Sequence, residues 1–197
     1  MGNDKMTGAL KRCAWCGDDE LYRTYHDEEW GVPVMDAPRL YEMLVLEGMQ
    51  AGLSWLTVLR KRARMREQFF AFDMEALATQ GDAAIAGWLE DPGIIRHRGK
   101  LEAMVGNARC ALAQDDFAGL LWDFAPARSP VRRARGDVPA QTPESQAMSR
   151  TLKKAGFRFV GPTICYAFMQ SVGMVNDHVG ACFRRAPCAE AQRQLAR

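Results

Sequence analysis

Apolar side chains recur every three or four residues through most of the chain. Between residues 54 and 70, for example, Trp55, Val58, Leu59 and Met65 follow this spacing, which is typical of the buried face of an α-helix. Comparable stripes and capped starts predict helices at about residues 36–49, 54–70, 73–77, 82–89, 101–112, 117–124, 142–154 and 162–172. We find no convincing strand pattern and no internal repeat, so the sequence predicts an all-α fold.

Two stretches lack this pattern. Residues 13–33 are dense in aromatic residues, cysteine and histidine but show little periodicity, and we interpret them as an irregular segment held by something other than its own secondary structure. Residues 126–142 are rich in proline, glycine and arginine, and a loop of this length is either functional or mobile. We expect residues 1–11 to be a disordered leader and residues 187–197 a flexible tail, which leaves residues 12–186 as one domain.

The composition fits one globular domain, because 48% of the 197 residues are hydrophobic and 25% are charged. The net charge of only +2 neither requires nor excludes a nucleic-acid partner. No run approaches the roughly 18 apolar residues of a membrane helix, and the N-terminal residues lack the apolar core of a signal peptide. We therefore expect a cytoplasmic monomer with no membrane partner, whose six cysteines are thiols or metal ligands.

Residues 46–55 combine an acid with a tight turn. Glu47 lies in an otherwise apolar run, glycines then let the backbone turn, and Ser54 is placed to cap a helix that begins at Trp55. An acid and an indole on two sides of one turn suit a pocket for a flat, hydrogen-bonding ring. The alternative is a helix-turn-helix within a core, with Glu47 at a solvated edge.

Basic residues are concentrated in a few places. Five of them lie at residues 60–66, opposite the apolar stripe, and we interpret them as a solvated face. Between Gly156 and Gly161 a short connection joins two predicted helices, and its glycines would let backbone N–H groups approach an anion. The basic residues beside this connection are Lys153, Lys154 and Arg158. A second basic turn at residues 96–100 strengthens the prediction of contacts along a nucleic-acid backbone.

The connection at residues 156–163, followed by the sequence VNDH at residues 175–178, resembles the hairpin and downstream segment of helix-hairpin-helix DNA glycosylases. More narrowly, the chain resembles the DNA-3-methyladenine glycosylase I family. The stretches that carry this resemblance are YHDEEWGVP at 25–33, LEG at 46–48, QAGLSW at 50–55, GIIRHRGK at 93–100 and VNDHV at 175–179. They span about residues 12–184 in the family's order.

The resemblance implies a helix-hairpin-helix glycosylase that everts a damaged nucleotide from double-stranded alkylated DNA and hydrolytically releases 3-methyladenine as the free base. It implies that Glu47 and Tyr25 are the catalytic residues, with Glu47 hydrogen-bonded to the purine edge. The residues expected to bind the base are Trp55, Trp15, Tyr22 and Trp30. An electron-poor cationic ring stacks well on such aromatics. Trp88 and Trp122 lie outside the matched stretches and are expected to be core residues.

The residues expected to contact DNA fall into two groups. One is the hairpin itself, through Gly161 and the basic residues Lys153, Lys154 and Arg158. The other is the turn after Glu47, where Leu53 or the backbone of Gly52 would enter the gap that the everted base leaves. This turn is equally compatible with a plain surface turn.

The segment after the hairpin departs from the wider superfamily at one position. Superfamily members place a catalytic aspartate two residues before the histidine, and here Asn176 stands at that place. An amide cannot act as a general base or as an anionic partner, so we do not expect the usual aspartate mechanism. A shift of one residue would bring Asp177 into use instead.

Two pairs of potential metal ligands lie at opposite ends of the chain. His178 and Cys182 would share one face if their segment is helical, and Cys13 and His26 lie in the irregular segment that needs an anchor. Cys2His2 is a good tetrahedral zinc set, and the resemblance implies structural zinc at these four residues, joining the two chain ends. From the residues alone, Cys16 could displace His26, or all of these side chains could be plain buried groups.

Two other functions remain open at this level. A zinc-stabilised helical DNA-binding module with no chemistry would need the hairpin and the metal but no buried acid facing aromatic rings. A glycosylase of altered range would release 3-methylguanine or another damaged base.

Overall fold

The structure is a computed structural model in which residues 10–195 are described, and every regular element in that range is a helix. The α-helices are α1 (Glu20–Glu28), α2 (Ala37–Gln50), α3 (Trp55–Gln68), α4 (Met74–Ala78), α5 (Asp82–Glu90), α6 (Arg98–Leu112), α7 (Phe117–Trp122), α8 (Pro143–Lys154), α9 (Pro162–Ser171) and α10 (Arg185–Leu195). Short 3-10 helices are η1 (Ala14–Cys16), η2 (Phe70–Phe72) and η3 (Arg135–Asp137). The predicted all-α fold is confirmed.

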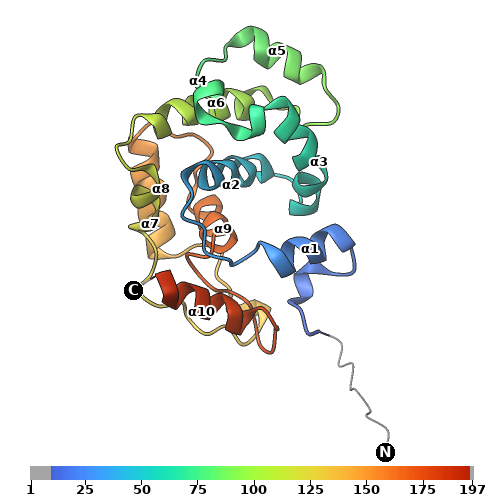
Figure 1. Ribbon diagram of the computed structural model, residues 1–197, viewed down its shortest axis with the longest axis vertical. Helices are drawn as coiled ribbons and strands as arrows, with labels where there is room; N and C mark the ends of the chain where they lie inside the picture. Colours follow the sequence, from blue (N-terminus) through green and yellow to red (C-terminus); the bar gives the residue numbers. More distant parts are fainter. Residues whose placement is uncertain (1–9, 196–197) are drawn as a thin grey trace, which may run out of the picture.

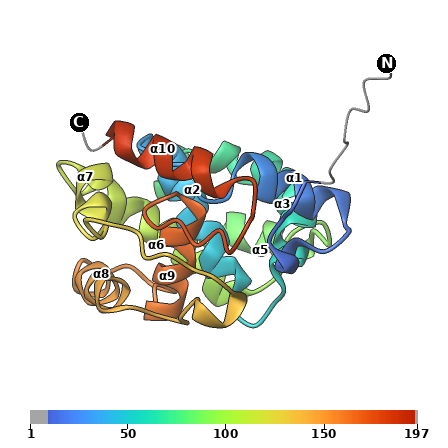
Figure 2. The same ribbon diagram turned by 90° about the horizontal axis from the view of Figure 1, so that it is seen from below.

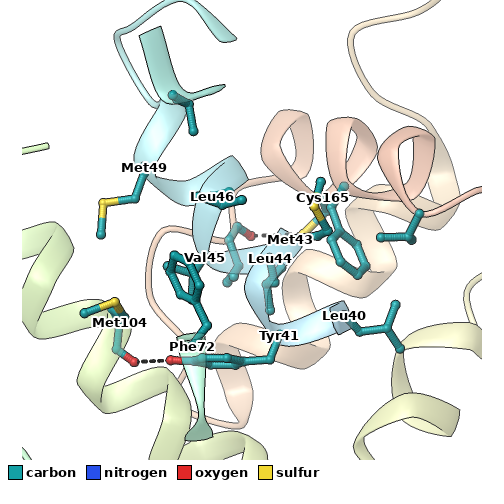
Figure 3. Close-up of a cluster of buried hydrophobic side chains, with 14 of the residues drawn as sticks. Leu40, Tyr41, Met43, Leu44, Val45, Leu46, Met49, Phe72, Met104 and Cys165 are labelled. Carbon is teal, nitrogen blue, oxygen red and sulfur yellow. Dashed lines mark hydrogen bonds between the residues drawn. The ribbon is translucent and has the colours of Figure 1, made fainter. Parts of the chain in front are cut away.

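Helix α2 is the centre of the molecule and packs against α3, α6 and α9 (Figure 1). Asp36 caps its start by accepting a hydrogen bond from the backbone N–H of Arg39, and Pro38 lies in the first turn, where it costs no hydrogen bond. Most of its residues are buried, as expected for a helix that is apolar nearly all round. Figure 3 shows Tyr41 reaching the carbonyl oxygen of Met104, to which its hydroxyl donates over 2.6 Å.

A segment near the start of the described chain contacts the loop before α10, on the far side of the molecule from α5. The backbone N–H of Phe183 donates to the carbonyl oxygen of Lys11 over 2.9 Å. Figures 1 and 2 show the first described residues beside the loop that leads into α10. The middle helices α3 to α6 lie on the other side of α2 (Figure 1). None of the helices in residues 10–195 combines the length and apolar character that crossing a bilayer needs.

The structure corrects two predictions about the chain ends. The segment expected to be irregular contains α1, which Asp19 caps by accepting from the backbone N–H of Tyr22 over 3.1 Å. The tail expected to be flexible forms most of α10, with Cys188 buried and Gln192 donating to the carbonyl oxygen of Gly173. The predicted leader lies largely outside the described residues.

The basic face at residues 60–66 is only partly solvated. Arg62 is 12% exposed and donates to the carboxylates of Glu29 and Glu42. This ties α3 to α2 and to the end of α1. The helical pattern gave no sign of these pairs, because both acids belong to other elements.

The basic turn at residues 96–100 is also divided. Arg96, His97 and Arg98 are exposed, but Lys100 is buried. Its ammonium group donates to the carbonyl oxygens of Met49 (2.9 Å) and Ala51 (2.6 Å). Lys100 therefore caps the negative end of α2 instead of facing a nucleic acid, since cations are favoured at helix C-termini.

Candidate active site

A cavity of about 380 Å³ opens beside α2 and takes side chains from segments far apart in the sequence. All six residues predicted for the pocket line it: Trp15, Tyr22, Tyr25, Trp30, Glu47 and Trp55. The sequence analysis missed Gln50, Arg135, Val138, Gln170 and several small apolar residues of its wall. An apolar cavity with few polar groups is the usual form of a small-molecule site.

Glu47 is the titratable group that stands out in this cavity. It is 4% exposed, and no ion pair to its carboxylate occurs within residues 10–195. Burial raises the pKa of Glu47 to about 8, with a smaller opposing effect from the Ser171 hydroxyl. Such a carboxyl exchanges its proton near neutral pH, and a cation bound beside it would favour the ionised form.

Aromatic rings surround this carboxyl. The ring centroids of Tyr25 and Trp55 are 5.3 Å apart, and Trp15 lies 5.0 Å from Tyr22 and 4.9 Å from Trp30. Burial, followed by the negative charge of Glu47, holds the pKa of Tyr25 well above its usual range, so its phenol stays protonated and can donate a hydrogen bond.

Trp55 is held at the first position of α3. Ser54 caps this helix by accepting from the backbone N–H of Thr57 over 3.1 Å. The indole N–H of Trp55 is buried and has no acceptor in the described part of the chain. A buried donor without a partner is costly, and such groups are often found at functional sites.

Asn176 and Asp177 have different positions. The Asn176 amide donates to the carbonyl oxygen of Arg185 and accepts from the backbone N–H of His178, so both of its ends are engaged in structural contacts. Asp177 lines the cavity, but its carboxylate accepts from three side chains: Arg132 (2.8 Å), Tyr166 (2.5 Å) and Gln170 (2.8 Å). Glu47 is therefore the carboxyl of this cavity that has no such partners.

The four predicted metal ligands meet in one buried group, with their ligand atoms all within 4.8 Å of one another. The sulfur of Cys182 lies 3.4 Å from Nε2 of His26 and 3.3 Å from Nδ1 of His178, and the Cys13 sulfur lies 3.7 Å from the same His178 nitrogen. This Cys2His2 group could hold a metal ion. The segment from His178 to Cys182 is a turn and not a helix, so the turn brings the two ligands together.

The second nitrogen of each histidine ring also has a partner. Nδ1 of His26 lies 2.7 Å from Asp27, and Nε2 of His178 lies 3.1 Å from the carbonyl oxygen of Trp30. Such contacts orient histidines that bind metals. Cys16 lies outside the group and donates to the carbonyl oxygen of Cys13. Because α1 and Trp30 supply both cavity residues and contacts of this group, the two sites support each other.

The residues predicted to contact DNA lie in the turn after α2, at the end of α8 and in the connection between α8 and α9. Leu53 is exposed beside Gly52, whose positive φ of 78° suits glycine. Lys153, Lys154 and Arg158 are also exposed. The connection between α8 and α9 is held by α6. Asn107 of α6 donates to the carbonyl oxygen of Arg158 and accepts from its backbone N–H. Gly161 precedes α9 as its N-cap.

Comparisons with known proteins agree with this arrangement. Residues 15–185 match the family described as Methyladenine glycosylase. DNA-3-methyladenine glycosylase 1 of Escherichia coli (strain K12) is 47% identical over 179 residues, which cover 88% of this chain and 96% of that protein. DNA-3-methyladenine glycosylase of Haemophilus influenzae is 46% identical over 184 residues, which cover 90% and 97%.

Solved structures show the same fold. A crystal structure of 3-methyladenine DNA glycosylase I (TAG) aligns with a TM-score of 0.86 at 46% identity, over 88% of this chain and 98% of that one. The enzyme from Staphylococcus aureus, in a structure that concerns recognition of 3-methyladenine, aligns with a TM-score of 0.85 at 32% identity, over 90% and 98%. Since the family match extends over most of the chain and includes nearly all residues that line the cavity, the chain belongs to the methyladenine glycosylase family.

Proposed function

We propose that this protein is a DNA repair glycosylase that releases 3-methyladenine from alkylated double-stranded DNA. The observation that carries this proposal is a buried carboxyl, Glu47, without a cationic partner in an aromatic cavity of about 380 Å³. The relatives from Escherichia coli and Haemophilus influenzae are both named as DNA-3-methyladenine glycosylases. A cavity of this kind suits a flat ring that carries a positive charge.

The base enters the cavity by rotation of its nucleotide out of the duplex. Tyr25 and Trp55 contact its rings, and Trp15, Tyr22 and Trp30 close the space around it. A desolvated cation on such rings gains up to about 2 kcal/mol from cation–π attraction. Neutral adenine gains less, so the aromatic walls contribute to selection by charge.

Glu47 supplies the stronger discrimination. Ionising it inside the cavity is unfavourable, as its raised pKa of about 8 shows. A methylated, cationic purine offsets that cost through its charge and its exocyclic amino group, whereas unmodified adenine provides no charge. Hydrolysis then breaks the C1′–N9 bond, whose electron pair neutralises the base, while water adds to C1′ and releases a proton. Because the base is already cationic, it leaves without being protonated by an acid, and the weakened bond leaves water little need of activation by a strong base.

The Cys2His2 group is proposed to hold structural zinc. Two thiolates and two imidazoles are a common tetrahedral set, and four protein ligands leave no open position for chemistry. Bound zinc would fix the ends of the chain to each other. The residues of this group would then act indirectly, by ordering α1 with its Tyr22 and Tyr25.

The DNA is proposed to lie across the hairpin and the end of α2, in a helix-hairpin-helix arrangement. The backbone N–H groups at the start of α9, after Gly161, would bind a phosphate, with Lys153, Lys154 and Arg158 supplying positive charge. The exposed side chain of Leu53 would fill the gap left by the everted base.

The test is incubation with methylated duplex DNA and identification of the bases released. We expect 3-methyladenine from the wild-type protein and at least a tenfold lower rate from Glu47→Gln, because a hydrogen bond to a charged group contributes about 1.5–3 kcal/mol. Glu90→Gln, on the exposed end of α5, is the matched control and should retain full activity.

A non-catalytic DNA-binding module would release no base from any variant. It would also fail to bind free 3-methyladenine, which quenching of tryptophan fluorescence would reveal. Normal release and normal base binding by Glu47→Gln would remove Glu47 from the mechanism.

A further inference from the structure

The loop at residues 126–142 forms one wall of the cavity, through Arg135 and Val138. It is fixed to the rest of the molecule at several points. The Ser129 hydroxyl accepts from the backbone N–H of Asn176 over 2.9 Å, and the carbonyl oxygen of Arg132 accepts from the backbone N–H of Gly180 over 3.1 Å. The loop is therefore a fixed part of the cavity wall, and its charged residues can contribute to binding.

Two arginines of this loop are in opposite situations. The guanidinium of Arg132 is 13% exposed and is neutralised by Asp177, 2.8 Å away. Arg135 is exposed at the edge of the cavity, and its guanidinium has no hydrogen-bond or ion-pair partner anywhere in residues 10–195. The loop thus holds one arginine that is internally satisfied and one that is available to a ligand.

The backbone around Arg135 is preorganised. The carboxylate of Asp137 accepts hydrogen bonds from the backbone N–H groups of Arg133 (2.8 Å) and Ala134 (3.0 Å), which closes the turn that presents η3. Arg135 and Tyr22 line the same cavity. Burial raises the pKa of the Tyr22 phenol, and the charge of Arg135 opposes that rise.

A free cation is unexpected at the mouth of a cavity that selects a cationic ring, since like charges repel. The repulsion disappears if the complex itself brings an anion to the same place. A nucleotide whose base fills the cavity carries its own phosphates past the rim, and the planar guanidinium of arginine matches phosphate oxygens with paired hydrogen bonds.

We propose that Arg135 binds a backbone phosphate next to the everted nucleotide and holds the DNA over the cavity. This inference rests on the proposed function, because it requires a nucleotide inserted at Glu47. It also assigns a role to the loop at residues 126–142, which lies apart from the hairpin in sequence and adds a second phosphate contact on the cavity side.

The test measures binding to a duplex that contains a tetrahydrofuran abasic site, over a series of salt concentrations. Arg135→Gln should bind roughly tenfold more weakly, because it loses a charged hydrogen bond. The plot of log K against log salt has a negative slope, and this substitution should make it less steep by about 0.9, the value for one phosphate contact. Arg135→Lys keeps the charge and should keep the slope. The matched control is Arg133→Gln, an exposed neighbour outside the cavity lining, which should leave both quantities unchanged.

Free 3-methyladenine should bind Arg133→Gln as it binds the wild type, and Arg135→Gln should lose much less affinity for this probe than for the duplex, since the phosphate is absent from it. An unchanged slope in Arg135→Gln would overturn the proposal, and so would an equal decrease in Arg133→Gln, which would indicate a diffuse field. Suppose that wild type binds free 3-methyladenine and releases it from methylated DNA, but that the salt slopes of wild type and Arg135→Gln do not differ. In that case only the role of Arg135 fails. If no variant, wild type included, binds or releases the base, the proposed function itself fails.

Discussion

Helix α2 carries two buried glutamates with opposite environments. Glu42 is 2% exposed and Glu47 is 4% exposed. The carboxylate of Glu42 accepts from Arg39 (3.0 Å), Arg62 (2.9 Å) and Arg66 (2.6 Å). Burial alone would raise the pKa of Glu42, but the three arginines outweigh it and lower the pKa below its usual value. Burial acts without such opposition on Glu47, whose pKa rises to about 8.

The difference follows from helix geometry. Five residues turn an α-helix by about 140° beyond a full turn, so the two side chains leave α2 in different directions. Glu42 points to the arginines of α3, and Glu47 points to the aromatic cavity. At Glu42 the protein supplies the positive charge itself. At Glu47 no cationic side chain of the described residues forms an ion pair, so a cationic ligand can supply the positive charge.

The largest effect should come from removing the satisfied carboxylate. Glu42→Gln leaves three guanidinium groups facing a neutral amide, and breaking a buried ion pair in this way costs about 3–5 kcal/mol. Urea unfolding at pH 7 measures the loss. Glu67→Gln is the control, because Glu67 is 64% exposed and pairs with Arg64 on the surface, where a pair contributes at most about 1 kcal/mol. A loss below that value in Glu42→Gln would show that the three arginines do not stabilise the buried Glu42 carboxylate.

The second effect concerns Glu47, where replacing the acid by glutamine should raise stability at neutral pH relative to the wild type. Glu47 has a folded-state pKa of about 8, above the roughly 4.3 of an unfolded glutamate. Its contribution is fully present below the unfolded pKa and is lost as pH rises toward 8. Wild type should therefore lose stability relative to Glu47→Gln by about 1.4 kcal/mol per pH unit, or about 3 kcal/mol between pH 5 and 7. Urea unfolding of both proteins from pH 4 to 9 tests this. A difference that does not change with pH would show that Glu47 is not held protonated by burial.

The contrast between the two acids also shows where sequence reasoning reached its limit. Helices that bury one face against the core have a stripe of apolar residues in the sequence. All eight helices predicted from such stripes and from capped starts are present. Helix α1 was not predicted, because its inward side chains are Tyr22, Tyr25 and His26, which face a cavity and a group that could hold a metal ion. Its residues follow the needs of the site more than those of the core.

Within the site, resemblance predicted what periodicity did not. A lone acid in a helix is most often exposed, so the burial of Glu47 and Glu42 was not evident from their own helix. The four predicted metal ligands lie in two segments about 150 residues apart, as the His26–Cys182 pair shows with its separation of 156. Gln170 and Arg135 were missed because each belongs to a segment that meets the cavity only after the chain has folded.

The smallest effect concerns the arginines themselves and decides which of them controls Glu42. Arg66 is 43% exposed, so Arg66→Gln should cost less than about 1 kcal/mol. Arg62 is 12% exposed and joins Glu42 to Glu29, so Arg62→Gln should cost several times more.

Because Arg39 and Arg62 remain in the Arg66 variant, the lowered pKa of Glu42 should persist, and the stability that Glu42 contributes should be lost only as pH falls through that value. Urea unfolding from pH 3 to 7 separates the variants. An Arg66→Gln loss as large as that of Glu42→Gln would mean that the carboxylate depends on its solvent-exposed partner, and that burial of the charge pair is not what distinguishes Glu42 from Glu47.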